Sequence, residues 1–190
     1  MQSGQTFLII GAFALLSTMT LNVNTALIGT STTGLEMEAT LDGMSIGQTL
    51  LDEILTQDFD QKVVGGVRVY SPDSLTTLAK FGPDGTAEQI SGNQGIDTSR
   101  TDNFQSMTKF NDVDDYSGYS RKSWNPRFGW YILTVKIDYV NEDNPYTVLT
   151  SPSFYKRVAV TVTHPNLVKD MKGNVIPITL QDLAVYRRFF

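Results

Sequence analysis

Phe7-Leu8-Ile9-Ile10-Gly11-Ala12-Phe13-Ala14-Leu15-Leu16 opens the charge-free segment that decides how this 190-residue chain folds. The first charged side chain is Glu36, and the first basic one is Lys62. Fully burying an apolar side chain of this size is worth about 1.5–3 kcal/mol, so a charge-free helix of this length is not stable alone in water. We expect it to be buried in lipid, in other protein, or in each by turns.

The helical pattern continues beyond this segment. Leu41, Met44, Leu51 and Leu55 recur at helical spacing, and Leu50 and Ile54 widen this apolar stripe. The polar side is expected to carry the acidic residues Glu36, Glu38, Asp42, Asp52 and Glu53. The sequence therefore predicts an N-terminal helix over residues 1–57, with a hydrophobic half at 1–28 and an amphipathic half at 29–57. Residues 29–34, Gly-Thr-Ser-Thr-Thr-Gly, are weak helix formers, so we expect a bend, an unwound stretch or a loop there.

Residues 58–190 are expected to form a globular, β-rich head. Period-two alternation over 129–139 and 155–163 predicts two strands, and two further runs between 175 and 188 are candidates for more. Residues 82–128 are rich in Gly, Asn, Asp, Ser and Thr, which indicates a long loop with one or two short elements. An antiparallel sheet needs cover on one face, and the amphipathic half of the helix can supply it. The predicted fold class is therefore α+β.

Composition and motifs argue against several functions. The net charge is −5, which does not favour a nucleic-acid partner. Cysteine is absent, so disulfides, thiol catalysis and cysteine metal sites are excluded. The sequence has no phosphate-binding glycine motif, and its single histidine, His164, stands beside a proline at the end of a strand. We expect no enzymatic activity.

Three interpretations of the charge-free segment are open. A cleaved signal peptide needs a basic start, which this sequence lacks. A simple membrane anchor needs about 20 apolar residues, and residues 7–28 are long enough although their second half is polar. A helix that leaves the membrane and packs beside copies of itself accounts for the polar half, because hydroxyls and amides can hydrogen-bond between helices. We favour this third interpretation.

This organisation resembles the type IV pilin and pseudopilin superfamily. Residues 110–118, Phe-Asn-Asp-Val-Asp-Asp-Tyr-Ser-Gly, resemble the Phe-x-Asp-x-Asp-Asp-Tyr-x-Gly stretch of minor pilins of the mannose-sensitive haemagglutinin type, and residues 155–162 are similar to the strand that follows it. Counting from Met1, Gln5 stands where pilins usually carry a glutamate that pairs with a neighbour's N-terminal amine. Gln5 can hydrogen-bond to that amine but cannot neutralise it. The pilin cysteine pair is also absent.

The resemblance implies a structural subunit of a type IV pilus-like extracellular filament at the cell surface. Such subunits lie in the inner membrane before assembly, form a helical homo-oligomer through the hydrophobic helix, and carry a methylated N-terminus. The alternative is a membrane-anchored pseudopilin or binding module of a secretion or pilus machine. The side chains expected to carry assembly are apolar and lie in the first half of the helix: Phe7, Leu8, Ile9, Ile10, Phe13, Leu15, Leu16 and Leu21.

One acidic cluster is the candidate for a bound ion. Asp112, Asp114 and Asp115 offer several carboxylate oxygens, the ligands that Ca²⁺ prefers. Their spacing does not match an EF-hand loop. The alternative is that the aspartates accept backbone hydrogen bonds in a turn that Gly118 completes. No other cofactor is expected.

Overall fold

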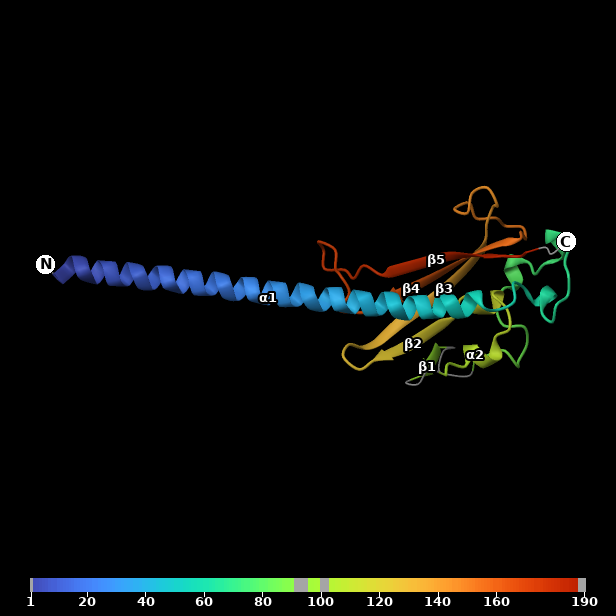
Figure 1. The fold of residues 1–190 in the computed structure, drawn as a ribbon, viewed down its shortest axis with the longest axis horizontal. Helices are drawn as coiled ribbons and strands as arrows, with labels where there is room; N and C mark the ends of the chain where they lie inside the picture. Colours follow the sequence, from blue (N-terminus) through green and yellow to red (C-terminus); the bar gives the residue numbers. More distant parts are fainter. Residues whose placement is uncertain (1, 91–95, 100–102, 188–190) are drawn as a thin grey trace. The chain divides into compact units, whose positions relative to one another are not determined.

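The computed structural model describes residues 2–90, 96–99 and 103–187, and it has the α+β class that the sequence predicts. It divides into two compact units, Met1–Glu38 and Ala39–Phe190. The helices and strands are labelled in Figure 1. In chain order they are α1 (Gln2–Leu55), β1 (Ile96–Ser99), α2 (Ser106–Lys109), β2 (Ser120–Asn125), β3 (Gly129–Tyr139), β4 (Tyr155–Thr163) and β5 (Ile178–Val185), with 3₁₀ turns at Gln61–Val63, Pro72–Ser74, Leu78–Lys80 and Asp114–Tyr116.

α1 is one uninterrupted α-helix of 54 residues. The unwound stretch or loop expected at residues 29–34 is not found. Each glycine costs about 1 kcal/mol relative to alanine, which is too little to break a helix with well-formed turns on both sides. The threonine hydroxyls of this stretch also bond within the helix, because Thr30, Thr32 and Thr33 each donate to the carbonyl four residues earlier at 2.9–3.1 Å.

The sheet has the strand order β1-β2-β3-β4-β5. All neighbouring pairs are antiparallel except β1 and β2, which run parallel. The strands expected at 129–139 and 155–163 are confirmed with those bounds as β3 and β4. The two runs expected between 175 and 188 form one strand, β5. The stretch expected as a long loop, residues 82–128, contains β1, α2 and β2.

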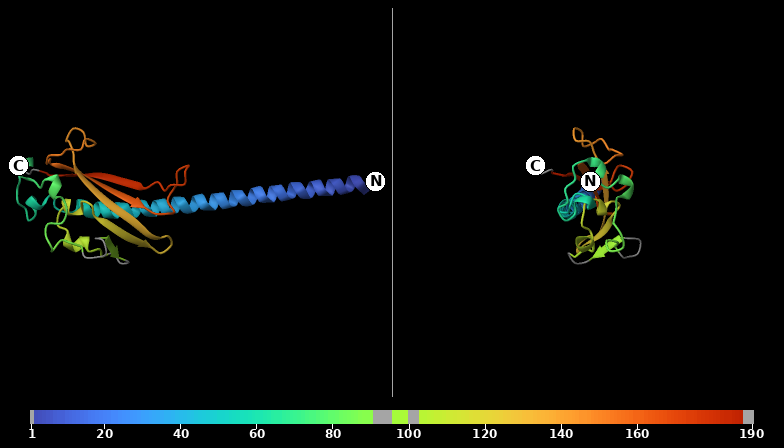
Figure 2. Two further views of the ribbon diagram at one scale, coloured as in Figure 1. Left: turned by 180° about the vertical axis from the view of Figure 1, so that it is seen from behind. Right: turned by 90° about the vertical axis from the view of Figure 1, so that its right-hand side faces the viewer.

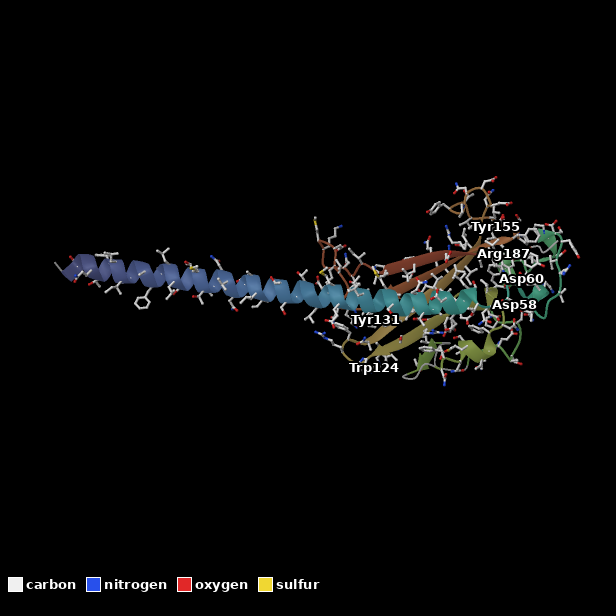
Figure 3. All side chains as sticks on the ribbon, viewed as in Figure 1. Asp58, Asp60, Trp124, Tyr131, Tyr155 and Arg187 are labelled. Carbon is white, nitrogen blue, oxygen red and sulfur yellow. The ribbon has the colours of Figure 1, made fainter. Side chains whose placement is uncertain are left out.

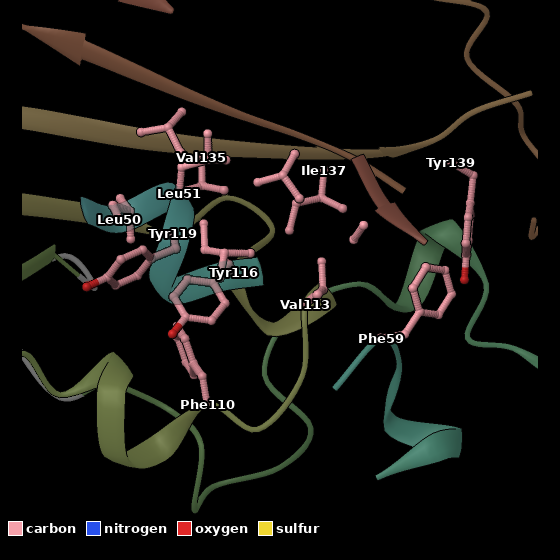
Figure 4. Packing of buried hydrophobic residues seen from close by; sticks show 14 of the residues in the cluster. Leu50, Leu51, Phe59, Phe110, Val113, Tyr116, Tyr119, Val135, Ile137 and Tyr139 are labelled. Atoms are coloured by element: carbon pink, nitrogen blue, oxygen red, sulfur yellow. The ribbon is translucent and has the colours of Figure 1, made fainter. Parts of the chain in front are cut away.

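The second part of α1 lies along one face of the sheet, as Figures 1 and 2 show. The inward-facing residues of the strands alternate, and their central members include Leu133, Val135, Val158 and Val160. They form one core with Leu50, Leu51 and Ile54 of the helix. Figure 4 shows part of this core, with Leu50, Leu51 and Val135 labelled. This packing is the reason that residues 39–55 belong to the second compact unit.

Small residues allow the helix to approach the sheet closely. Ala39, Gly43 and Gly47 follow one another at four-residue spacing and are all buried. A Cβ added at Gly47 would stand 2.8 Å from Val162 Cγ2, closer than two such carbons can pack. The sequence pattern placed Leu41 and Met44 on the packed side, and this is wrong, because Leu41 is 68% and Met44 43% exposed.

Candidate assembly helix and the buried acidic cluster

The side chains predicted to carry assembly stand on the surface of the first compact unit. All eight, from Phe7 to Leu21, are between 56% and 76% exposed. Because successive residues of an α-helix are turned by about 100°, these eight positions are distributed on all sides of α1. Side chains along this part of the helix are drawn as sticks in Figure 3. By length and composition α1 is able to cross a membrane. Covering these eight side chains is worth on the order of 10 kcal/mol, so they need an apolar environment.

The threonine hydroxyls of this apolar segment donate to carbonyls within the helix. Thr18 Oγ1 donates to the Leu15 carbonyl at 2.9 Å, and Thr20 Oγ1 donates to the Leu16 carbonyl at 2.8 Å. Thr25 makes the same kind of bond to the carbonyl four residues before it. A hydroxyl with an internal acceptor costs little in lipid or in a protein interior. The threonines of the second half are therefore compatible with either environment.

Gln5 lies in the first turns of α1 and is exposed. It is placed where a second molecule can reach it. Its contact with the N-terminal amine of a neighbouring copy stays a prediction.

The cluster of Asp112, Asp114 and Asp115 lies in the second compact unit and is almost fully buried. Asp112 and Asp115 cap one turn reciprocally. Asp115 Oδ2 accepts the backbone N–H of Asn111 at 3.0 Å, and Asp112 Oδ1 accepts the N–H of Asp115 at 3.1 Å. Gly118 completes the turn with a φ of +74°, a conformation that favours glycine. The turn interpretation of Asp112 and Asp115 is thus confirmed.

Asp114 instead faces a buried lysine. Lys156 Nζ donates to Asp114 Oδ1 at 2.5 Å, to Asp60 Oδ2 at 3.2 Å and to the carbonyl of Phe59 at 2.6 Å. The three hydrogens of the ammonium therefore all have acceptors. The rings of Phe59, Phe81 and Tyr139 lie 4.5–5.4 Å from the same nitrogen. Lys156 thus shares a buried region of the head with four aspartates, Asp60, Asp112, Asp114 and Asp115.

Sequence reasoning missed Lys156 and Asp60. Lys156 occupies an inward position of β4, in line with Val158 and Val160. A lysine on the apolar face of a strand requires buried acidic partners, and that signal was available in the alternation of residues 155–163. The partner Asp60 could not be found in this way, because a loop brings it to the sheet from 96 positions away.

The buried carboxyls differ in their affinity for protons. Burial raises the pKa of Asp112 to about 9, and the negative charges of Asp114 and Asp115 add to this effect. Burial also raises the pKa of Asp114, although Lys156 opposes it. For Asp60 burial acts in the same direction, but the Lys156 ammonium and hydrogen bonds from Lys62 and Thr76 outweigh it, so its pKa is lowered.

Asp112 is therefore protonated at neutral pH. The Oδ2 atom of Asp112 is buried and has no hydrogen-bond partner. A hydrogen bond with the Asp112 side chain lowers the pKa of Asp114. A protonated Asp112 adds no negative charge beside Lys156, whose ammonium faces Asp60 and Asp114.

A second buried ion pair fastens the end of α1 to the sheet. Arg121 Nη2 on β2 lies 2.6 Å from Glu53 Oε2, and both side chains are almost covered. Glu53 Oε1 also accepts from the hydroxyls of Ser106 and Tyr116, at 2.8 and 2.9 Å. The helical pattern had placed Glu53 on the solvent side. In the fold it is an anchor, because β2 supplies a buried cation opposite it.

Among the described residues, no group of three or more acidic or histidine side chains is arranged to hold a metal ion. The Lys156 ammonium lies between Asp60 and Asp114. Calcium binding at Asp112, Asp114 and Asp115 stays a prediction. It is checked by whether added Ca²⁺ raises the melting temperature of the protein.

No protein-family model, curated protein or solved structure matches the chain. The long apolar N-terminal helix and the mostly antiparallel sheet nevertheless form a pilin-like architecture.

Proposed function

We propose that the chain is a member of the type IV pilin superfamily and a structural subunit of a pilus-like extracellular filament. The observation that carries this proposal is the first part of α1, a helix covered on all sides with exposed apolar side chains. A helix used only to pack against its own head would be apolar on one face. This helix instead requires apolar surroundings on every side.

The proposed mechanism is assembly, in which α1 moves from one apolar environment to another. Before assembly the helix lies in the inner membrane, and in the filament it packs among identical helices at the cell surface. The internally bonded threonines support this, since they need no external partner in either place. The transfer therefore exposes little apolar surface to water at either end.

The experiment is electron microscopy of the material sheared from cells that make the full chain. Wild type is expected to give uniform fibres. Leu15→Lys places a charge among the exposed apolar residues, at a cost of about 2.5–3.5 kcal/mol at the centre of a membrane helix, and it is expected to give none. Met171→Lys, on the exposed surface of the head, is the matched control and keeps the fibres. Mass spectrometry of the native protein tests the expected methylated N-terminus.

One feature supports a second candidate, a membrane-anchored pseudopilin or binding module. An open hollow of about 630 Å³ lies in the second compact unit, and its lining includes the exposed side chains of Val67 and Tyr70 beside Tyr186. Such a hollow is large enough for a partner's side chains. If wild-type protein is found only as detergent-solubilised monomers, with no fibres, this second function replaces the first.

A further inference from the structure

Two amide side chains in the apolar part of α1 differ from the hydroxyls around them. The structure describes every residue from 7 to 28, and within that range the threonine hydroxyls all donate to carbonyls of the helix itself. The side chains of Asn22 and Asn24 have no hydrogen-bond partner there, and neither does Ser17. These are the polar groups of the segment that still need one.

An unpartnered amide is costly in an apolar environment. Asparagine carries two N–H donors and a carbonyl acceptor, which hydrocarbon cannot satisfy. A second asparagine can satisfy them, because the amide group is self-complementary. Copies of one chain that pack in a fixed register bring the same amides to every interface. The partner that fits is therefore a second copy of this chain.

The positions of the two amides specify how many neighbours are needed. Successive residues of an α-helix are turned by about 100°, so Asn22 and Asn24 are about 200° apart and lie on nearly opposite faces. Ser17 and Ser31 are each seven residues from Asn24 and share its face. A partner helix that covers the face of Asn24 cannot reach Asn22.

We infer that Asn22 and Asn24 hydrogen-bond to two different neighbouring copies and thereby fix the register of the assembled helices. This inference rests on the proposed filament function and adds to it the groups that determine alignment. Apolar side chains such as Leu21 and Ile28 supply adhesion, but they slide past one another with little change in energy. A buried polar group within an apolar interface selects one alignment, because any other alignment leaves it unpaired. A two-helix dimer is excluded, since it leaves one amide unpaired.

The direct test is a cryo-electron microscopy map of wild-type fibres at side-chain resolution. Each amide is expected to lie within hydrogen-bond distance of a polar atom of a different neighbouring copy. A map in which either amide contacts only apolar side chains, or in which both face the same neighbour, overturns the inference and leaves the filament function intact. Wild-type protein that forms no fibres overturns the filament function itself, and the inference with it.

Variants test the same point through helical order. Asn22→Leu and Asn24→Leu keep the helix apolar and able to enter the membrane, and each is expected to give fibres with more than one helical rise, or about tenfold fewer fibres. Thr20→Val is the matched control, because its hydroxyl is bonded within the helix, and it keeps the wild-type symmetry and yield. Leucine variants with the single wild-type symmetry and full yield contradict the inference.

Discussion

Replacing Asp112 with asparagine is expected to stabilise the second compact unit at neutral pH. Asparagine has nearly the same shape and is neutral, and its NH₂ group can take the place of the protonated Oδ2. The backbone N–H of Asp115 keeps its acceptor, because the amide oxygen replaces Asp112 Oδ1. The substitution therefore removes an ionisable group and retains its contacts.

The magnitude follows from the two pKa values of Asp112. In the native protein the pKa is about 9, whereas in the unfolded chain it is about 3.9. Between these values the native state holds a proton that the unfolded state has released, so stability falls by about 1.4 kcal/mol for each unit that the pH rises. At pH 7 the wild-type protein has therefore lost at most about 4 kcal/mol of folding stability. The Asp112→Asn variant does not lose it, because asparagine is neutral in both states.

The assay is urea unfolding of the full chain in detergent, followed by the fluorescence of Trp124 and Trp130 at a series of pH values. The difference between Asp112→Asn and wild type is expected to be near zero at about pH 4 and to grow steadily toward about pH 8. The titration of groups distant from Asp112 cancels in this difference. A difference that does not change with pH, or a variant less stable than wild type at neutral pH, would refute the assignment of a protonated Asp112.

Three further substitutions test the packing and the ion cluster of the head by the same unfolding measurement. Gly47→Ala is expected to cost about 1–3 kcal/mol because its Cβ meets the side chains of β4 and β5 at 2.8–2.9 Å, whereas Gly34→Ala, which meets nothing within 4 Å, should not destabilise the protein. Lys156→Met leaves two buried carboxylates without their cation and should cost about 3–5 kcal/mol at neutral pH, a loss that acid partly restores. Asp60→Asn should destabilise the protein at neutral pH, with the loss disappearing only as the pH falls through the lowered native pKa of Asp60.

The sequence predicted well those helices and strands in which apolar residues recur with a single regular spacing. The alternation of apolar residues in β3 and β4 depends on local geometry, and it predicted both strands with their bounds. Helical spacing was less informative in the second part of α1. Leu50, Leu51 and Ile54 of the predicted stripe are buried, but Leu41 and Met44 are exposed. The buried face has glycine at two positions, since a close approach to the sheet excludes larger side chains.

The sequence predicted the parts of the candidate site that are contiguous in the chain, and it did not predict the contacts between distant residues. The apolar segment and the acidic turn are contiguous, and both were found from the residues alone. The partners of the acidic turn were not, because Lys156 and Asp60 reach it from distant parts of the chain. Arg121 and Glu53 were missed for the same reason. The sequence indicates a buried ion pair only where a charged residue interrupts an apolar pattern, as Lys156 does in β4.

The internally bonded threonines leave one question about assembly, namely what makes the helix prefer the filament to the membrane. Apolar side chains have little preference, because lipid tails and neighbouring helices are similar apolar environments. Threonines with acceptors in their own helix have little preference either. Asn22 and Asn24 differ, since hydrocarbon offers them nothing and a neighbouring copy offers a complementary amide. In a helix that is otherwise indifferent to its surroundings, these two residues would supply the preference for assembly as well as its register.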